Sequence, residues 1–266
     1  MQLTQSFKRA AFSLPLVGEL RRLRHDRVFR NAGWNCFQGV FPTLEAALAA
    51  VPEGRPSSYD NEACAEMYSE RLDRVFEHDY PMLFWLKPLV AKARRVFDLG
   101  GHVGIAHYGY ERYLGSLEAL EWNVCDVPAV VDAGRRLATQ RQRSGLTFTT
   151  RTEELDGADI LYASGSLQYI TTTRLPELIA ACALPPKHVL LNMTPMTELP
   201  TFFTLNNICA AICPYLVQNE KALHQAMGAL GYRTVDAWTN PEKRCDLPLT
   251  PEHSVNGYRG LYFARV

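Results

Sequence analysis

Three glycines and an aspartate stand together where a strand-like run gives way to a helix-like one. The run Arg95–Leu99 contains Asp98, and Gly100, Gly101 and Gly104 follow it. Glycine lets a backbone turn sharply and approach a ligand closely, so the segment is typical of a loop that binds a nucleotide-like cofactor. No Gly-Lys-Ser/Thr follows, which excludes the phosphate-binding loop of nucleoside triphosphatases. A glycine-rich turn that serves close packing alone is the structural alternative.

A second acidic residue stands at the end of the next strand-like run. Leu120–Cys125 is followed by Asp126 and Val127. The carboxyl ends of parallel strands meet at one edge of a sheet, where a carboxylate can accept both hydrogens of a ribose diol. The sequence Asp-Val-Pro would also suit an N-cap for a helix beginning near Pro128. Both roles stay open, and either is compatible with a nucleoside site at this edge.

Strand-like and helix-like runs alternate after residue 93, which predicts a parallel sheet with crossover helices. The expected strands are 95–99, 120–125, 146–149, 160–163, 188–192, 232–238 and 258–266, with helices over 105–114, 129–141 and 174–183. The last two strands lack a helix between them, so the strand at 258–266 is expected to be antiparallel. We therefore predict an α/β, Rossmann-like fold with a seven-stranded, mostly parallel sheet. A helical cap would span residues 1–90, and a cofactor-binding catalytic domain residues 91–266.

The amino-acid composition limits the kinds of partner that the protein is expected to bind. The 266 residues include 28 basic and 28 acidic ones, and this balance disfavours nucleic acid. The first 30 residues are rich in basic side chains, which indicates a solvated arm, with membrane or partner contact as the lesser alternative. Asn206, Asn207 and Pro214 interrupt the longest apolar run, so no membrane span is expected. Seven cysteines without zinc-like spacing predict reduced thiols, no metal and a cytoplasmic location.

Together these motifs resemble class I S-adenosylmethionine-dependent methyltransferases. Asp98–Gly104 is similar to their first motif, and Asp126–Val131 resembles a segment of small-molecule O-methyltransferases. Over residues 34–200 the chain resembles a bacterial methyltransferase family linked to surface-glycan or secondary-metabolite pathways, most specifically at Ser164–Ile170. The resemblance implies the class I methyltransferase fold, S-adenosylmethionine as cofactor, and O-methylation of a small molecule, either a biosynthetic intermediate or a sugar.

The resemblance also assigns roles to residues of this chain. The cofactor would be bound at the glycine loop and at the strand ends, by Asp98, Gly100, Gly101, His102, Gly104, Asp126, Val127, Ser164, Gly165 and Ser166. In the small-molecule O-methyltransferases a histidine after the fourth strand deprotonates the substrate, and the matching place here reads Gln168-Tyr169. Glutamine cannot accept a proton at neutral pH, so these two side chains would orient the substrate through hydrogen bonds.

The proton acceptor is open among three alternatives. His102 in the glycine loop or His107 one turn into the following helix could act as the base, or an ionised nucleophile would need none. We place His107 slightly ahead, because a helical position can aim a side chain over the sheet edge. Packing in the loop and exposure on the helix surface are the structural alternatives for the two histidines.

The acceptor substrate would bind beyond the fifth strand. Residues 192–196 and 202–207 combine apolar side chains with amides at a strand end, where open α/β sheets bind ligands. A helix packed in the core or at a dimer interface explains the second segment equally well, which leaves a homodimer open. Trp34, Phe37 and Tyr59 would either cap the cofactor or pack the cap against the core.

Two other functions remain as alternatives. A non-catalytic, methyltransferase-fold partner subunit is motivated by the missing histidine and the basic arm. A nicotinamide-dependent oxidoreductase would require Gly-x-Gly-x-x-Gly, whereas the loop here is Gly-Gly-x-x-Gly.

Overall fold

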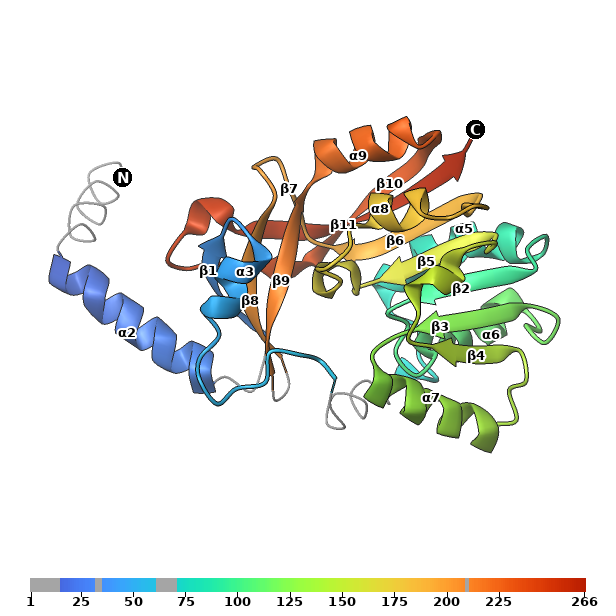
Figure 1. Ribbon diagram of the computed structural model, residues 1–266, viewed down its shortest axis with the longest axis horizontal. Coiled ribbons are helices and arrows are strands. Elements are labelled where there is room, and N and C mark those ends of the chain that lie inside the picture. Colours follow the sequence, from blue (N-terminus) through green and yellow to red (C-terminus); the bar gives the residue numbers. More distant parts are fainter. Residues whose placement is uncertain (1–14, 32–34, 61–70, 209–210) are drawn as a thin grey trace.

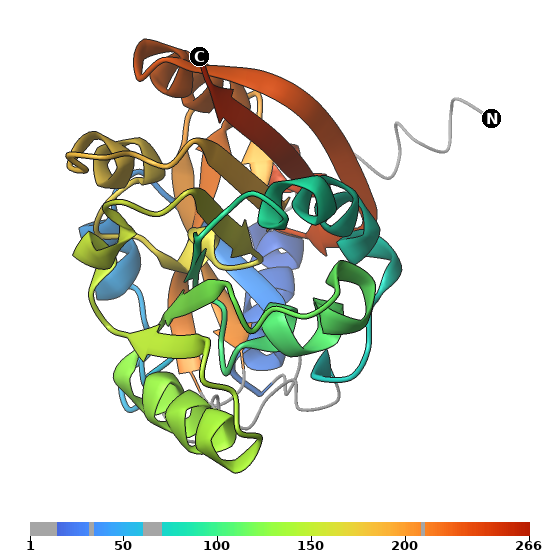
Figure 2. The ribbon, with the colours of Figure 1, turned by 90° about the vertical axis from the view of Figure 1, so that its right-hand side faces the viewer.

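The computed structural model describes residues 15–31, 35–60, 71–208 and 211–266. This part of the chain forms a seven-stranded sheet and a four-stranded sheet, which occupy different parts of the molecule (Figure 1). Helices cover both faces of the larger sheet (Figure 2). None of the helices in the described ranges is both long enough and apolar enough to cross a membrane.

The large sheet has the strand order β10-β11-β6-β5-β2-β3-β4. Its strands are β2 (Arg95–Leu99), β3 (Glu121–Cys125), β4 (Leu146–Thr149), β5 (Ile160–Ser164), β6 (His188–Thr194), β10 (Tyr232–Cys245) and β11 (Val255–Arg265). The strands from β6 to β4 pair in parallel, whereas β11 is antiparallel to both β6 and β10. The predicted seven-stranded, mostly parallel sheet with an antiparallel last strand is confirmed.

The point where the strand order reverses lies at β2. The chain runs outward from β2 through β3 to β4 and then returns to place β5 on the other side of β2. Ligands of open α/β sheets bind outside the carboxyl ends of the strands at such a reversal. The glycine loop directly follows β2, so the topology puts it at this position.

Helices pack on the sheet because side chains of successive strand residues point to opposite faces. Val96 belongs to the core under α5 (Tyr80–Val90), α6 (Ile105–Leu114) and α7 (Pro128–Gln140). Phe97 belongs to the core under α8 (Leu175–Ala180), α9 (Glu220–Ala229) and the short helix η3 (Thr152–Leu155). Both side chains are fully buried. The crossover helices predicted at 105–114, 129–141 and 174–183 correspond to α6, α7 and α8.

The small sheet was not expected from the sequence. It has the order β1-β8-β9-β7, with strands β1 (Cys36–Phe41), β7 (Met196–Thr197), β8 (Phe202–Ile208) and β9 (Ala211–Asn219). The interpretation of residues 202–207 as a helix is therefore wrong. These residues pair antiparallel with both β1 and β9, and every side chain of β8 is buried. A strand covered on both faces lacks the alternation by which strands are usually recognised.

Residues 1–90, where a helical cap was expected, contain both kinds of element. The described helices are α2 (Pro15–Asn31), α3 (Leu44–Ala49), α5 and the short η2 (Glu77–Asp79), but β1 is a strand. α2 projects away from the small sheet (Figure 1). Phe29 near its end is buried, whereas Leu20 and Leu23 are exposed. Trp34, expected to help cap the cofactor, lies outside the described residues.

Candidate functional site

The glycine loop lies tightly against neighbouring chain segments. Gly100 has a positive φ of 74°, and a Cβ built there would lie 2.2 Å from the Cβ of Ser166. The Ser166 hydroxyl donates a hydrogen bond to the carbonyl oxygen of Leu99. Gly104, with φ 91°, begins α6 in a left-handed conformation that side chains rarely adopt. The backbone of the loop therefore requires glycine at these two positions.

Asp98 lies beneath the loop, with none of its surface exposed to solvent. The indole Nε1 of Trp122 donates to its Oδ2 at 3.0 Å, while Oδ1 has no hydrogen-bond partner among the described residues. A Cβ on Gly101 would lie 2.3 Å from the Asp98 carboxyl carbon, which shows how closely the loop covers this group. Burial raises the pKa of Asp98 to about 7. A buried, unpartnered carboxylate oxygen is costly unless a ligand supplies its donor.

Asp126 fixes the loop from the end of β3. Its Oδ2 accepts a hydrogen bond from the backbone N–H of His102 at 2.9 Å, and its Oδ1 accepts from the N–H of Val127 at 2.8 Å. Desolvation raises the pKa of this carboxyl. The first turn of α7 is capped instead by Asp60, whose Oδ1 accepts from the N–H of Ala129 at 2.9 Å. Asp126 therefore fixes the backbone of the glycine loop, and it does not cap the first turn of α7.

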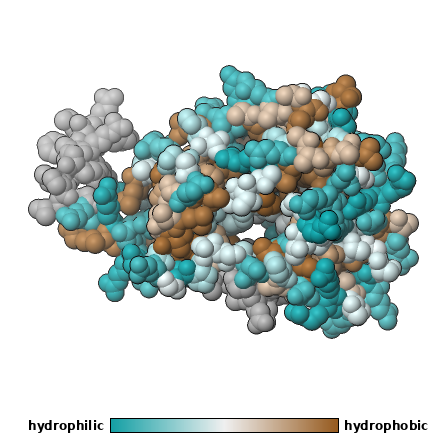
Figure 3. All heavy atoms as spheres, in the orientation of Figure 1, coloured by the Kyte–Doolittle hydropathy of each residue, from teal (hydrophilic) through white to brown (hydrophobic). Residues whose placement is uncertain are grey.

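A cavity of about 660 Å³ opens at the glycine loop and extends toward the small sheet. The molecular surface is hollowed between the parts of the molecule that hold the two sheets (Figure 3). Most of the residues expected to bind cofactor or substrate line this cavity, namely Asp98, Gly100, Gly101, His102, Asp126, Val127, Ser164, Gly165, Ser166, Gln168 and Tyr169. The structure therefore brings together residues from three separate strand ends, those of β2, β3 and β5.

The two histidines considered as bases lie in different environments. His102 lines the cavity and has a positive φ of 57°, a conformation that is uncommon outside glycine and often marks a functional site. His107 is buried in the core, with its ring 5.8 Å from that of Trp122, and is not among the cavity-lining residues. Desolvation and Arg143 lower the pKa of His107 to about 4. This placement argues against His107 as the base and leaves His102 as the histidine at the cavity.

Gln168 and Tyr169 belong to the short helix η4 (Leu167–Tyr169), which follows β5. The Gln168 Nε2 donates to the carbonyl oxygen of Gly165 at 2.8 Å, whereas its Oε1 is buried without a partner in the described part of the chain. The Tyr169 hydroxyl donates to Oδ1 of Asn206 on β8 at 2.7 Å. Gln168 therefore offers the cavity an acceptor oxygen, and Tyr169 offers an aromatic ring whose hydroxyl is already engaged.

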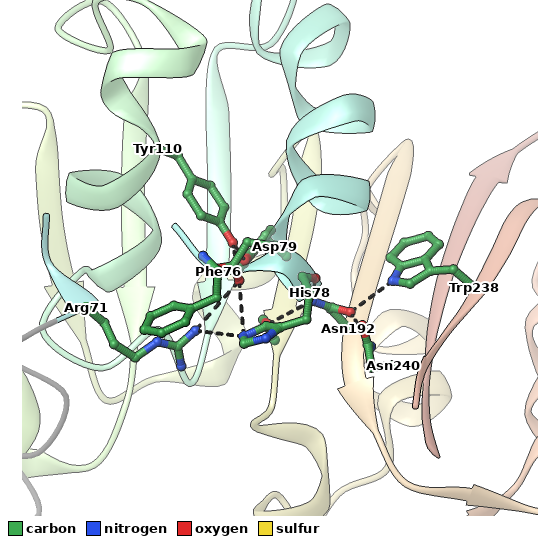
Figure 4. A network of polar contacts seen from close by, with 10 residues as sticks. Arg71, Phe76, His78, Asp79, Tyr110, Asn192, Trp238 and Asn240 are labelled. Carbon is green, nitrogen blue, oxygen red and sulfur yellow. Dashed lines mark hydrogen bonds and ion pairs between the residues drawn. The ribbon is translucent and has the colours of Figure 1, made fainter. Parts of the chain in front are cut away.

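A buried polar network borders the cavity between α6 and the segment before α5 (Figure 4). Asp79 accepts hydrogen bonds from the Tyr110 hydroxyl and the Phe76 N–H, both at 2.9 Å, and its Oδ1 lies 3.6 Å from the Arg71 guanidinium. The Tyr110 hydroxyl also lies 3.0 Å from that of Tyr162 on β5. This network carries no sequence signal, because Asp79 precedes Pro81 in an ordinary helix-start pattern and no spacing links it to Tyr110.

The same network continues to the far edge of the large sheet. Asn192 on β6 donates through Nδ2 to the carbonyl oxygen of His78 at 2.8 Å. Its Oδ1 accepts from Trp238 at 3.0 Å and from Asn240 at 2.9 Å, both on β10 (Figure 4). Asn192 was expected to face an acceptor substrate. Its side chain instead joins β6, β10 and the segment before α5, so it fixes the wall of the cavity.

The small sheet provides the wall opposite the glycine loop. Tyr215 on β9 is buried and donates its hydroxyl hydrogen bond to Tyr258 on β11 at 2.7 Å, which ties the two sheets together. The Phe37 ring lies 5.0 Å from that of Tyr215, and the Tyr169 ring lies 5.1 Å from it. Phe37 thus packs in this wall, while Tyr59 lines the cavity itself. In the described ranges, no group of three His, Cys, Asp or Glu side chains is placed to hold a metal ion.

The sequence and the fold were compared with those of known proteins. No family model matches the sequence, and a search of curated proteins finds no match. Among solved structures, magnesium protoporphyrin IX methyltransferase from Synechocystis, with S-adenosylhomocysteine bound, is similar with a TM-score of 0.50 and 12% identity over 79% of this chain and 97% of that one. The chain has the class I methyltransferase fold, as the sequence predicted.

Two proteins of Burkholderia thailandensis are similar at lower TM-scores. One is 1,6-didemethyltoxoflavin-N1-methyltransferase, with a TM-score of 0.47 and 18% identity over 71% of this chain and 79% of that one. The other is an O-methyltransferase family protein, with a TM-score of 0.47 and 14% identity over 93% of this chain and 70% of that one.

Proposed function

We propose that this chain is an S-adenosylmethionine-dependent methyltransferase that methylates an oxygen atom of a small molecule. The observation that carries the proposal is the glycine loop over the unpartnered oxygen of Asp98, at the carboxyl end of β2. This pair opens into a cavity that continues to an aromatic wall, so one space can hold a cofactor and an acceptor together. Residues 91–266 would bind the cofactor, with residues 1–90 completing the cavity.

The residues present fit the cofactor. Oδ1 of Asp98 is an acceptor for the methionine ammonium, and the glycine loop leaves room where any Cβ would intrude. Asp126 uses two of its four lone-pair positions on backbone amides and keeps the others for a ribose diol. When bound, the cofactor supplies an activated sulfonium methyl group. The S-adenosylhomocysteine bound in the Synechocystis enzyme of the same fold supports this assignment.

The contribution of the chain to catalysis is alignment and proton removal. Oε1 of Gln168 would accept the hydrogen bond of the acceptor hydroxyl and so fix its direction. The bound cofactor would supply its methyl group to the acceptor oxygen, and S-adenosylhomocysteine would be the product that leaves. The Gln168 amide cannot take up the proton, so the hydroxyl would have to release it from this hydrogen bond to the His102 imidazole or to water. Alignment alone contributes about 7–11 kcal/mol in favourable cases, so a weak base suffices.

Oxygen as the methylated atom rests on the resemblance of Asp126–Val131 to small-molecule O-methyltransferases. A small acceptor agrees with a cavity of about 660 Å³, which lies in the range of small-molecule sites. The Gly-Gly-x-x-Gly spacing speaks against a nicotinamide cofactor.

Calorimetric titration tests the cofactor directly. S-Adenosylhomocysteine should bind with one site per chain and a dissociation constant in the micromolar range, and NADH should release no binding heat. Binding of NADH in place of S-adenosylhomocysteine would make the chain an oxidoreductase. Binding of S-adenosylmethionine without methyl transfer to any member of a broad panel of hydroxylated acceptors would favour a non-catalytic partner subunit.

A further inference from the structure

Three cationic side chains gather on one part of the cavity wall. Arg71, Arg74 and Lys243 all line the cavity. The guanidinium carbons of Arg71 and Arg74 lie 5.2 Å and 4.7 Å from the centre of the same ring, that of Phe76. Lys243 comes from β10, and burial together with the nearby Arg71 charge lowers its pKa. Arg71 therefore shares one ring with Arg74 and lies near the Lys243 ammonium, so three cations line this part of the cavity.

The described part of the protein balances only one of these charges. Asp79 is the carboxylate that forms an ion pair with them, its Oδ1 lying 3.6 Å from Nη2 of Arg71, and the charge of Glu242 also acts on the neighbouring His78. Neither Arg74 nor Lys243 forms an ion pair with any carboxylate in the described ranges. Arg74 and Lys243 are exposed at the open side of the cavity, so water reaches both, and an array of one sign at this wall concentrates ligands of the opposite sign.

The cofactor would not remove this excess. S-Adenosylmethionine carries a sulfonium, an ammonium and a carboxylate, so its net charge is +1. The cavity-lining carboxylates at the cofactor end are Asp98 and Asp126, and the first would be matched by the cofactor ammonium. The carboxylate of the cofactor would neutralise one positive charge, while its sulfonium would add another. The remaining wall still lacks an anion.

We propose that the acceptor substrate is an acid, whose carboxylate or phosphate is bound by Arg74 and Lys243 while its hydroxyl meets Gln168. This inference rests on the proposed methyltransferase function. The rings of Tyr169 and Tyr215, which line the cavity, add flat apolar surface, which suits a cyclic or aromatic body between the two polar ends.

The test uses protein saturated with S-adenosylhomocysteine. Inorganic phosphate, 4-hydroxybenzoate and neutral 4-hydroxybenzamide are titrated by calorimetry. We expect phosphate or 4-hydroxybenzoate to bind and 4-hydroxybenzamide to bind at least tenfold more weakly, and the preferred anion distinguishes a phosphate from a carboxylate substrate. Lys243→Met and Arg74→Met should each weaken the anion about tenfold or more, as expected for a charge-assisted hydrogen bond.

Matched controls are Lys221→Met on α9 and Arg136→Met on α7, because both side chains are exposed and outside the cavity lining. They should leave anion binding unchanged. S-Adenosylhomocysteine affinity, measured in the same variants, should stay within about twofold of the parent. A loss of cofactor affinity in Lys243→Met and Arg74→Met without anion binding to the parent would show that the cations serve the cofactor, and would overturn the inference.

Failure of the two proposals is distinguishable. Absence of S-adenosylhomocysteine binding to the parent protein contradicts the methyltransferase function itself. Normal S-adenosylhomocysteine binding, with neither anion bound more tightly than the amide, contradicts only the acidic acceptor.

Discussion

The two ends of the cavity are built in different ways. The glycine-loop end comes from loops after three neighbouring parallel strands. It is fixed by hydrogen bonds to the backbone: the His102 N–H donates to Asp126, and the Ser166 hydroxyl donates to the carbonyl oxygen of Leu99. The acceptor end is formed by segments distant in the chain, joined by aromatic rings and by the Tyr215–Tyr258 hydrogen bond. Backbone geometry tolerates few substitutions, whereas a wall of side chains can change its specificity residue by residue.

The largest effect is expected at the glycine-loop end. In Gly101→Ala the new Cβ would lie 2.3 Å from the Asp98 carboxyl carbon, and Trp122 holds that carboxyl in place. The loop must shift, so affinity for S-adenosylhomocysteine should fall by about 100-fold or more, as expected when several polar contacts to a ligand are lost. Calorimetry measures this change. The control is Gly228→Ala in α9, where nothing lies within 4 Å and binding should be unaffected.

Asp98→Asn removes the charge beneath the loop while keeping the shape of the side chain. At pH 8 we expect affinity for S-adenosylhomocysteine to fall about 10- to 100-fold, because the ammonium loses a charged partner. At pH 6 the difference should shrink, since the pKa of Asp98 is raised to about 7 and much of the parent is already protonated. Calorimetry at the two pH values measures the affinity for S-adenosylhomocysteine. An equal loss of affinity at both would mean that the carboxylate charge does not contribute.

Asp98 and His107 both contact Trp122, and their pH dependences are opposite in sign. The pKa of Asp98 is raised to about 7, so the native state holds a proton that the unfolded chain has lost, and stability falls as pH rises from 4 to 7. The pKa of His107 is lowered to about 4, so the unfolded chain binds a proton first, and stability rises as pH increases from 4 to 6.5. In the parent protein the two contributions oppose each other.

The smallest effect on ligand binding is expected from His107→Leu. Removing the histidine should remove its opposing contribution, so between pH 4 and 7 the free energy of unfolding should fall by a few kcal/mol relative to the parent, on the order of 1.4 kcal/mol per pKa unit. Urea unfolding across this range measures it, and Asp98→Asn should change the slope relative to the parent in the opposite direction. Affinity for S-adenosylhomocysteine should stay within about twofold of the parent in His107→Leu. A large loss of cofactor affinity would instead place His107 at the site.

The glycine-loop end could be predicted from the sequence because its signals are local. Asp98, the glycines and Asp126 each adjoin a strand whose apolar run is readable over five or six residues. The small sheet could not be predicted from the sequence, because β8 is buried on both faces and its partner β1 lies far away in the chain. The cluster of Arg71, Arg74 and Lys243 could not be predicted for a similar reason, because only the fold brings β10 to the same cavity as residues 71 and 74.

His107 shows the limit of a positional argument. A helix after a glycine loop presents some side chains to the ligand and others to the sheet, and the sequence does not settle which face His107 occupies. In the structure it packs on Trp122 beside the sheet, with an unpartnered Nδ1 and a lowered pKa. His102 kept its place at the cavity because the loop itself, rather than a helix face, determines its position.

The pairing of β1 with β8 also sets the order in which the protein can form during synthesis. The Thr204 hydroxyl on β8 donates to the carbonyl oxygen of Gln38 on β1 across 166 positions of the chain. Strands β2 to β5, which carry the glycine loop, are complete by residue 164, well before β8 has been made. A chain is synthesised from its N-terminus, so β1 is made first and its edge stays unpaired with β8 while the glycine-loop end assembles. The acceptor end is therefore the last part of the cavity to close, and β1 is short, only six residues, which limits the edge that it exposes meanwhile.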